Sequence, residues 1–177
     1  MTLYRVFTRD PSAAPTEPGG ALYMPPIGHG RINNPSYRVL YAASHPEAAI
    51  ADRFGRYAVW DAKMFDGPSG RSLGLATFSL PDSARIENLD DAARLVDLAL
   101  RPSDVVTPDY EVSRAWAARI HDAGGHAGVS WWSWYDSRWH SFGLWDIDRL
   151  VVSDVVDVRS SMPVVERAAT SIHKLLR

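Results

Sequence analysis

The segment from residue 10 to residue 36 contains six of the 12 prolines and four of the 12 glycines of the chain. Proline removes a backbone donor and both residues weaken regular elements, so this density excludes a helix or a central strand. Patterns typical of strands flank the segment, at 1–7 and 38–43. Long loops are usually disordered tails or functional covers, and a loop pinned between two strands favours a cover. We therefore expect a long functional loop inside a compact domain.

The remaining elements are predicted from hydrophobic periodicity and from turn residues. Strands are expected at 73–80, 129–135, 139–145 and 151–158, and helices at 47–54, 89–100, 107–123 and from about 163. Strands and helices are interspersed without regular alternation, which favours an α+β domain over a doubly wound parallel sheet. With 177 residues and no internal repeat, we expect one domain over residues 1–177.

The predicted helices carry signals for their ends and for their buried faces. Ser44 and Glu47 have the spacing of a capping box at the start of the helix 47–54. The helix 107–123 carries apolar residues at intervals of four, which we expect to be buried: Val112, Trp116 and Ile120. The C-terminal helix places one apolar stripe at Val165, Ala169, Ile172 and Leu176.

Charge and composition exclude several classes of function. The formal net charge is −2, from 19 Lys and Arg against 21 Asp and Glu, so no global field gathers nucleic acid or an anionic membrane. The N-terminus lacks a signal-peptide pattern, and no run of about 18 apolar residues predicts a membrane span. The chain has no Cys, and its six His include no pair at helical spacing, so we expect no metal site. Disulfides are impossible and a reducing cytoplasm is the expected location.

No common catalytic signature is present, so candidate residues must be judged one by one. Arg31, in the long loop, could bind phosphate through two parallel hydrogen bonds or be a solvated surface residue. Tyr41, in an apolar strand, could pack in the core or form a stacking platform. Asp52 lies near the apolar side of its helix and needs a partner, either a ligand hydroxyl or a neighbour such as Arg53 or Arg56.

The least ordinary stretch is rich in tryptophan, because five of the seven tryptophans fall between residues 131 and 145. If residues 129–135 form a strand, its alternation puts Trp131, Ser133 and Tyr135 on one face. That face could stack a planar ligand, with room beside the small Ser133 and a hydroxyl to offer, or it could simply pack in the core.

Taken together, Arg31, Tyr41, Asp52 and Ser133 resemble the functional residues of the RES domain family in order and context. The resemblance covers nearly the whole chain: Leu3-Tyr4-Arg5-Val6 at the start, Gly30-Arg31-Ile32-Asn33, the segment 39–49, and Gly128 to Ser133. It implies a fold similar to ADP-ribosyltransferases of the diphtheria-toxin type, with NAD as substrate and no cofactor. Many members are toxins of bacterial toxin–antitoxin pairs that destroy NAD by hydrolysis or phosphorolysis and are neutralised by an Xre-type helix-turn-helix antitoxin.

The resemblance also implies a role for each residue. Arg31 would bind the NAD pyrophosphate or an attacking phosphate, and Asp52 the ribose hydroxyls and the charge that develops on the sugar. Tyr41 would stack on the substrate, and Ser133 would hydrogen-bond nicotinamide or ribose. From its place on the aromatic face, Trp131 is expected to bind substrate as well. Arg31, Asp52 and Ser133 are thus the expected catalytic residues.

The chain departs from the family pattern at its acidic residue. Asp52 stands where the family has Glu and is shorter by one methylene, about 1.5 Å, and Ile32 replaces a common aromatic residue. Two alternatives therefore stay open: a protein ADP-ribosyltransferase, or a catalytically weakened domain that acts as a binding module.

Overall fold

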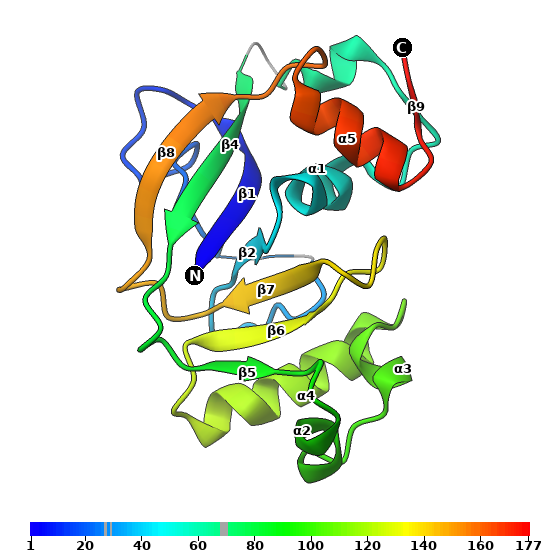
Figure 1. Cartoon of the computed structure of the whole chain (residues 1–177). Helices are drawn as coiled ribbons and strands as arrows, with labels where there is room; N and C mark the ends of the chain where they lie inside the picture. The colour runs from blue at the N-terminus through cyan, green and yellow to red at the C-terminus, as the bar shows by residue number, and fades with distance from the viewer. Residues whose placement is uncertain (27, 29, 68–70) are drawn as a thin grey trace.

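A computed structural model describes residues 1–26, 28, 30–67 and 71–177. Its main element is a seven-stranded sheet with the strand order β5-β6-β7-β2-β1-β4-β8 (Figure 1). Neighbouring strands are antiparallel, except for the parallel pair β5 and β6. The strands of this sheet are β1 (Thr2–Arg9), β2 (Leu40–Ala43), β4 (Ser72–Ser79), β5 (Ile86–Asn88), β6 (Gly128–Trp132), β7 (His140–Leu144) and β8 (Val151–Asp157).

The helices form two groups at different parts of the sheet (Figure 1). One group lies near β1 and consists of α1 (Pro46–Phe54), α5 (Pro163–Ser171) and the 3₁₀ helix η1 (Ala62–Phe65). The other lies beside β5 and β6 and consists of α2 (Ala92–Asp97), α3 (Pro102–Val105) and α4 (Tyr110–Ala123). A short parallel pair, β3 (Val59–Trp60) and β9 (Leu175–Leu176), lies outside the main sheet. The predicted α+β class is confirmed, with a mostly antiparallel sheet.

Strands β1 and β2 meet at only one register pair, Tyr4 with Ala43. By contrast, β1 pairs with β4 along its whole length and β2 pairs with β7 along its whole length. The sheet therefore consists of two well-paired parts, β8-β4-β1 and β2-β7-β6-β5, that run in clearly different directions in Figure 1. The long loop 10–39 connects these two parts, because it joins β1 to β2.

The buried side chains form separate clusters on these parts. One cluster lies between α1, α5 and the β1 side and includes Ile50 and Trp60. Another lies between α4 and β6 and includes Ile32 and Trp116. The expected burial of Trp116 and Ile120 is confirmed, whereas Val112 is exposed. The buried face of α4 follows the helical repeat through Ser113, Trp116, Ala117 and Ile120, and a strict interval of four drifts away from that face.

The capping box predicted for α1 is wrong, because both of its residues bind elsewhere. The N-cap is His45, without a side-chain cap. The Ser44 Oγ accepts a hydrogen bond from the His140 amide at 2.9 Å, and the Glu47 carboxylate binds Arg167 of α5 at 2.7 Å. These residues connect α1 to β7 and to α5 instead of capping the helix.

The C-terminal and central helices are shorter than predicted. Helix α5 ends at Ser171 because His173 adopts a left-handed conformation with φ of 56°, and Leu176 then pairs with β3 instead of lying on the helix. The helix predicted at 89–100 is reduced to α2, which Ala99 ends with φ of 51°. Both residues have positive φ, which is unusual outside glycine and which hydrophobic periodicity does not reveal.

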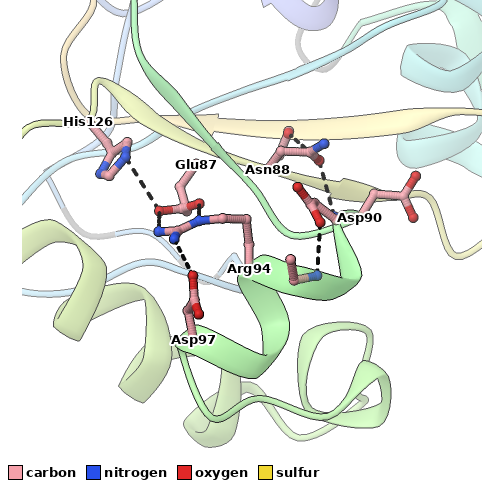
Figure 2. A network of polar contacts seen from close by, with 9 residues as sticks. Glu87, Asn88, Asp90, Arg94, Asp97 and His126 are labelled. Atoms are coloured by element: carbon pink, nitrogen blue, oxygen red, sulfur yellow. Dashed lines mark hydrogen bonds and ion pairs between the residues drawn. The ribbon is translucent and has the colours of Figure 1, made fainter.

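Strand β5 was missed by the sequence analysis and carries a charged network centred on the buried carboxylate of Glu87 (Figure 2). Arg94 of α2 donates two hydrogen bonds to the buried carboxylate of Glu87, each at 2.8 Å, and a third to Asp97 at 2.7 Å. The Nε2 atom of His126 lies 3.4 Å from the same carboxylate. The hydrogen bonds from Arg94 lower the pKa of Glu87. The network fixes α2 to the edge of the sheet.

Candidate active site

A cavity of about 530 Å³ brings together residues of β2, β6 and β7 with residues of α1, the start of α4 and the long loop. Four residues of the sequence prediction line it: Arg31, Tyr41, Asp52 and Trp131. They come from the long loop, β2, α1 and β6, which lie far apart in the sequence. The other lining residues are Gly30, Ala42, Pro108, Tyr110, Trp134, Tyr135 and Ser141.

A smaller cavity of about 200 Å³ shares Tyr41, Ala42 and Asp52 with the first. Its remaining walls include Tyr4 and Arg5 of β1. It therefore lies where β1 and β2 diverge after their single register pair. Asp52 borders both cavities and stands at the junction of the two parts of the sheet.

Arg31 is half-buried and is already held by the protein. Its Nη1 atom donates to the carbonyl oxygen of Thr107 and, at 3.5 Å, to that of Val105. Its guanidinium carbon lies 5.3 Å from the centre of the Tyr110 ring, which is a cation–π distance. Burial lowers the pKa of Arg31, while Tyr110, Tyr41 and Asp52 act in the opposite direction. The group is positively charged and faces the cavity with donors that the two carbonyls do not use.

Asp52 lies in the last turn of α1 and is open to the water of the cavity. The surrounding walls nevertheless desolvate its carboxylate, and this burial raises its pKa to about 7, with Arg31 acting in the opposite direction. A ligand that displaces the cavity water would strengthen this desolvation. Among the described residues, no hydrogen bond or ion pair joins the carboxylate of Asp52 to another side chain, including its neighbours Arg53 and Arg56. The group is thus available to a ligand and changes its charge near neutral pH.

The ring of Tyr41 lines the cavity, but its hydroxyl is turned toward the loop that carries Arg31. The hydroxyl accepts a hydrogen bond from the Ile32 amide and donates one to the Asn33 side chain, both at 3.0 Å. Burial raises the pKa of Tyr41 well above its usual range, so the hydroxyl stays protonated. Only the face of the ring is free to contact a ligand.

The tryptophan-rich segment divides between core and cavity. Trp131 is buried and packs edge-on against Trp116, with the ring centres 6.4 Å apart, while another part of it lines the cavity. Trp134 lies in the cavity lining with 65% of its surface exposed. A large exposed aromatic residue beside a cavity is a candidate platform for a planar ligand.

Ser133 is not among the residues that line the cavity. Strand β6 ends at Trp132, so the alternation that the sequence analysis extended to Tyr135 stops before Ser133. The Ser133 amide instead donates to the Trp139 carbonyl at 2.7 Å, and its Oγ accepts from the Tyr135 amide at 3.2 Å. The serine that lines the cavity is Ser141 of β7, which lies opposite Trp131 in the sheet register.

Several lining residues were missed by sequence reasoning. Tyr110 and Pro108 enter the cavity from the start of α4, and Tyr135 enters from the turn after β6. If the sequence analysis had predicted the pairing register of β6 and β7, it would have placed Ser141 beside Trp131. No signal in the sequence reveals that the start of α4 faces the loop of Arg31, because that contact is purely tertiary.

Two further properties of the described residues bear on the class of site. No group of three or more His, Cys, Asp or Glu within the described ranges could hold a metal ion. Within the same ranges, every helix is too short or too polar to span a bilayer.

The fold and the cavity define an α+β protein with a concave site of aromatic walls and a few convergent charged groups, the usual form of a small-molecule binding or catalytic site. The model of the RES domain family matches residues 2–164. The chain belongs to the RES domain family, as its motifs indicated.

One solved structure with a similar fold is the crystal structure of the M. tuberculosis MbcT-MbcA toxin-antitoxin complex. The toxin chain MbcT matches this chain with a TM-score of 0.58 and 17% sequence identity, over 89% of this chain and 84% of that chain. At this identity the likeness shows the fold. No curated protein matches the chain.

Proposed function

We propose that this protein is an NAD-cleaving enzyme that acts as the toxin of a toxin–antitoxin pair. The observation that carries the proposal is the cavity that a guanidinium, Arg31, and a carboxylate, Asp52, line together between aromatic walls. Membership of the RES domain family and the fold shared with a toxin of a toxin–antitoxin complex support it.

The reaction would break the bond between the nicotinamide nitrogen and the ribose carbon. The electrons of this bond stay on nicotinamide, which leaves as a neutral base, and positive charge develops on the sugar. The carboxylate of Asp52 would stabilise this charge and bind the ribose hydroxyls, while Arg31 would bind the pyrophosphate or an attacking phosphate. Water as acceptor gives ADP-ribose and a proton, and phosphate gives the 1-phosphate of ADP-ribose.

The aromatic residues would bind the planar parts of the substrate. Tyr41 and Trp131 present ring surface to the cavity, in support of the stacking role proposed for them. The direct hydrogen bond proposed for Ser133 has less support, because its hydroxyl is outside the cavity lining. Ser141, which is within the lining, is a better candidate for that hydrogen bond.

The proposal extends to partner, location and ancestry. An Xre-type helix-turn-helix antitoxin would neutralise the protein in the cytoplasm, where its substrate is made and used. A relationship to ADP-ribosyltransferases of the diphtheria-toxin type is part of the same proposal, and the mostly antiparallel seven-stranded sheet with its cavity of about 530 Å³ supports it.

Release of nicotinamide from NAD by the purified chain tests the function. We expect turnover by the wild type, loss of turnover in Asp52→Asn, and wild-type rates in the control Asp82→Asn, whose side chain is 99% exposed. Reactions with and without phosphate identify the acceptor. Labelled NAD distinguishes the alternatives: label on protein indicates an ADP-ribosyltransferase, and absence of any turnover leaves a binding module.

A further inference from the structure

The backbone amides on either side of Arg31 are hydrogen-bonded to the side chains of Asn33 and Tyr41, which are bonded to each other. Asn33 is buried, and its Oδ1 accepts hydrogen bonds from the Gly30 amide at 2.7 Å and from the Tyr41 hydroxyl at 3.0 Å. The Tyr41 hydroxyl in turn accepts from the Ile32 amide at 3.0 Å. The amides immediately before and after Arg31 are therefore both fixed by the Tyr41–Asn33 pair.

Helix α4 fixes the same loop from the other side. Ser113 is fully buried, and its Oγ donates to the carbonyl oxygen of Arg31 at 2.6 Å. Arg114, the next residue of α4, donates to the Gly30 carbonyl at 3.4 Å. The same Oγ lies 3.3 Å from the carbonyl oxygen of Tyr110 in its own helix, which is the usual contact of a helical serine, but the bond to Arg31 is much shorter and connects α4 to the loop.

The close packing explains the glycine that precedes Arg31. A Cβ atom at Gly30 would lie 2.3 Å from the Tyr41 hydroxyl oxygen and 2.5 Å from the Asn33 Oδ1. Both distances are far below van der Waals contact, so any other residue would separate Tyr41 from Asn33. The loop backbone, Tyr41 and Asn33 thus form one closely fitted unit.

We propose that Tyr41, Asn33 and Ser113 are positioning residues, which hold the loop backbone so that the Arg31 guanidinium is presented to the cavity in one orientation. The inference rests on the proposed function in that Arg31 is the group that binds a phosphate-bearing substrate. Tyr41 then contributes to substrate binding mainly through its hydroxyl, and not only by stacking. A preorganised arginine binds a phosphate group more tightly because less conformational freedom is lost on binding.

Inorganic pyrophosphate is the probe for this proposal, and isothermal titration calorimetry measures its binding to the full chain. We expect Arg31→Ala to weaken binding about 10- to 100-fold, as for loss of a charge-assisted pair of hydrogen bonds. Tyr41→Phe and Ser113→Ala should each weaken it about fivefold to tenfold, in line with the loss of the one or two hydrogen bonds that each hydroxyl makes to the loop. In the Arg31→Ala background, neither substitution should have any further effect, because both act through Arg31.

The chain offers matched controls for both substitutions. Tyr37→Phe also removes a tyrosine hydroxyl, but this hydroxyl has no hydrogen-bond partner among the described residues. Ser130→Ala also removes a buried serine hydroxyl, which contacts Asn88 at 3.4 Å, away from the loop. Both controls should bind pyrophosphate like the wild type. Thermal melts identify variants that do not fold, and if one of the two test variants fails, the other carries the experiment.

Three outcomes would overturn the proposal: no binding of pyrophosphate by the wild type, unchanged binding in both Tyr41→Phe and Ser113→Ala, or the same loss with and without Arg31. The titration needs no catalysis, so a chain that binds pyrophosphate but releases no nicotinamide refutes the enzyme and leaves the positioning role standing. If NAD is cleaved, both substitutions should raise KM for NAD more than they lower kcat. The reason is that the pyrophosphate would be bound equally in the substrate complex and in the transition state.

Discussion

If the ionised form of Asp52 stabilises the developing positive charge, NAD cleavage should increase with pH through neutrality. Its pKa is raised to about 7 by burial. The ionised fraction then rises from about 10% at pH 6 to about 90% at pH 8, so kcat/KM should rise about ninefold over this interval. A carboxyl with an ordinary pKa is fully ionised over the whole interval and would give a flat profile. The magnitude of the rise therefore measures how far the pKa of Asp52 is raised.

Initial rates of nicotinamide release at low NAD concentration and constant ionic strength give the required profile, because kcat/KM reports the free enzyme. Replacing Arg31 by Met removes the positive charge that opposes the shift, so the midpoint should move to higher pH.

Thermal unfolding tests the raised pKa of Asp52 independently of activity. Between the unfolded pKa of about 4 and the folded pKa, the folded state binds more protons, so wild type should lose stability relative to Asp52→Asn as pH rises from about 4 to 7. A falling rate profile would refute the role of the ionised Asp52, and a flat profile would refute its raised pKa.

Three further predictions concern the framework and the cavity rim. Glu87→Gln should lower the melting temperature at pH 7, and the difference from wild type should shrink as pH falls below the usual carboxyl range, since Arg94 lowers the pKa of Glu87; equal loss at all pH values would contradict this. Gly143→Ala should destabilise the chain by about 1–3 kcal/mol, because the new Cβ would lie 2.2 Å from Ile32, and unchanged stability in urea unfolding would refute it. Trp134→Ala should leave stability unchanged and raise KM for NAD about fivefold through lost stacking; unchanged KM would exclude a contact with substrate.

Much of the fold could be predicted because its longer elements have strong local patterns. The strands β1, β4 and β8 and the helix α4 follow their hydrophobic periodicity, and the prolines and glycines correctly exclude regular structure from most of the long loop. The short strands β3, β5 and β9 could not be found. With two or three residues each, and Glu87 in the middle of β5, they show no periodicity, and their partners lie far away in the sequence.

The site could be predicted only as far as motifs reach. Arg31 and Asp52, which line the cavity, were proposed because their neighbours resemble a family pattern, not because any local rule marks them. Ser141 and Tyr110 depend on strand register and on the packing of α4 against the loop, which a single sequence does not contain. The sequence also does not reveal that β6 ends at Trp132, one residue before Ser133, where the chain turns.

The single register pair between β1 and β2 has a consequence for how the protein can change in evolution. Asp52 stands on a helix whose packing belongs to one hydrophobic cluster, whereas the loop of Arg31 is anchored through Ile32 to another. Substitutions deep inside either cluster can therefore alter the distance between Asp52 and Arg31 without changing any residue that lines the cavity. Homologues with identical cavity residues can for this reason differ in rate.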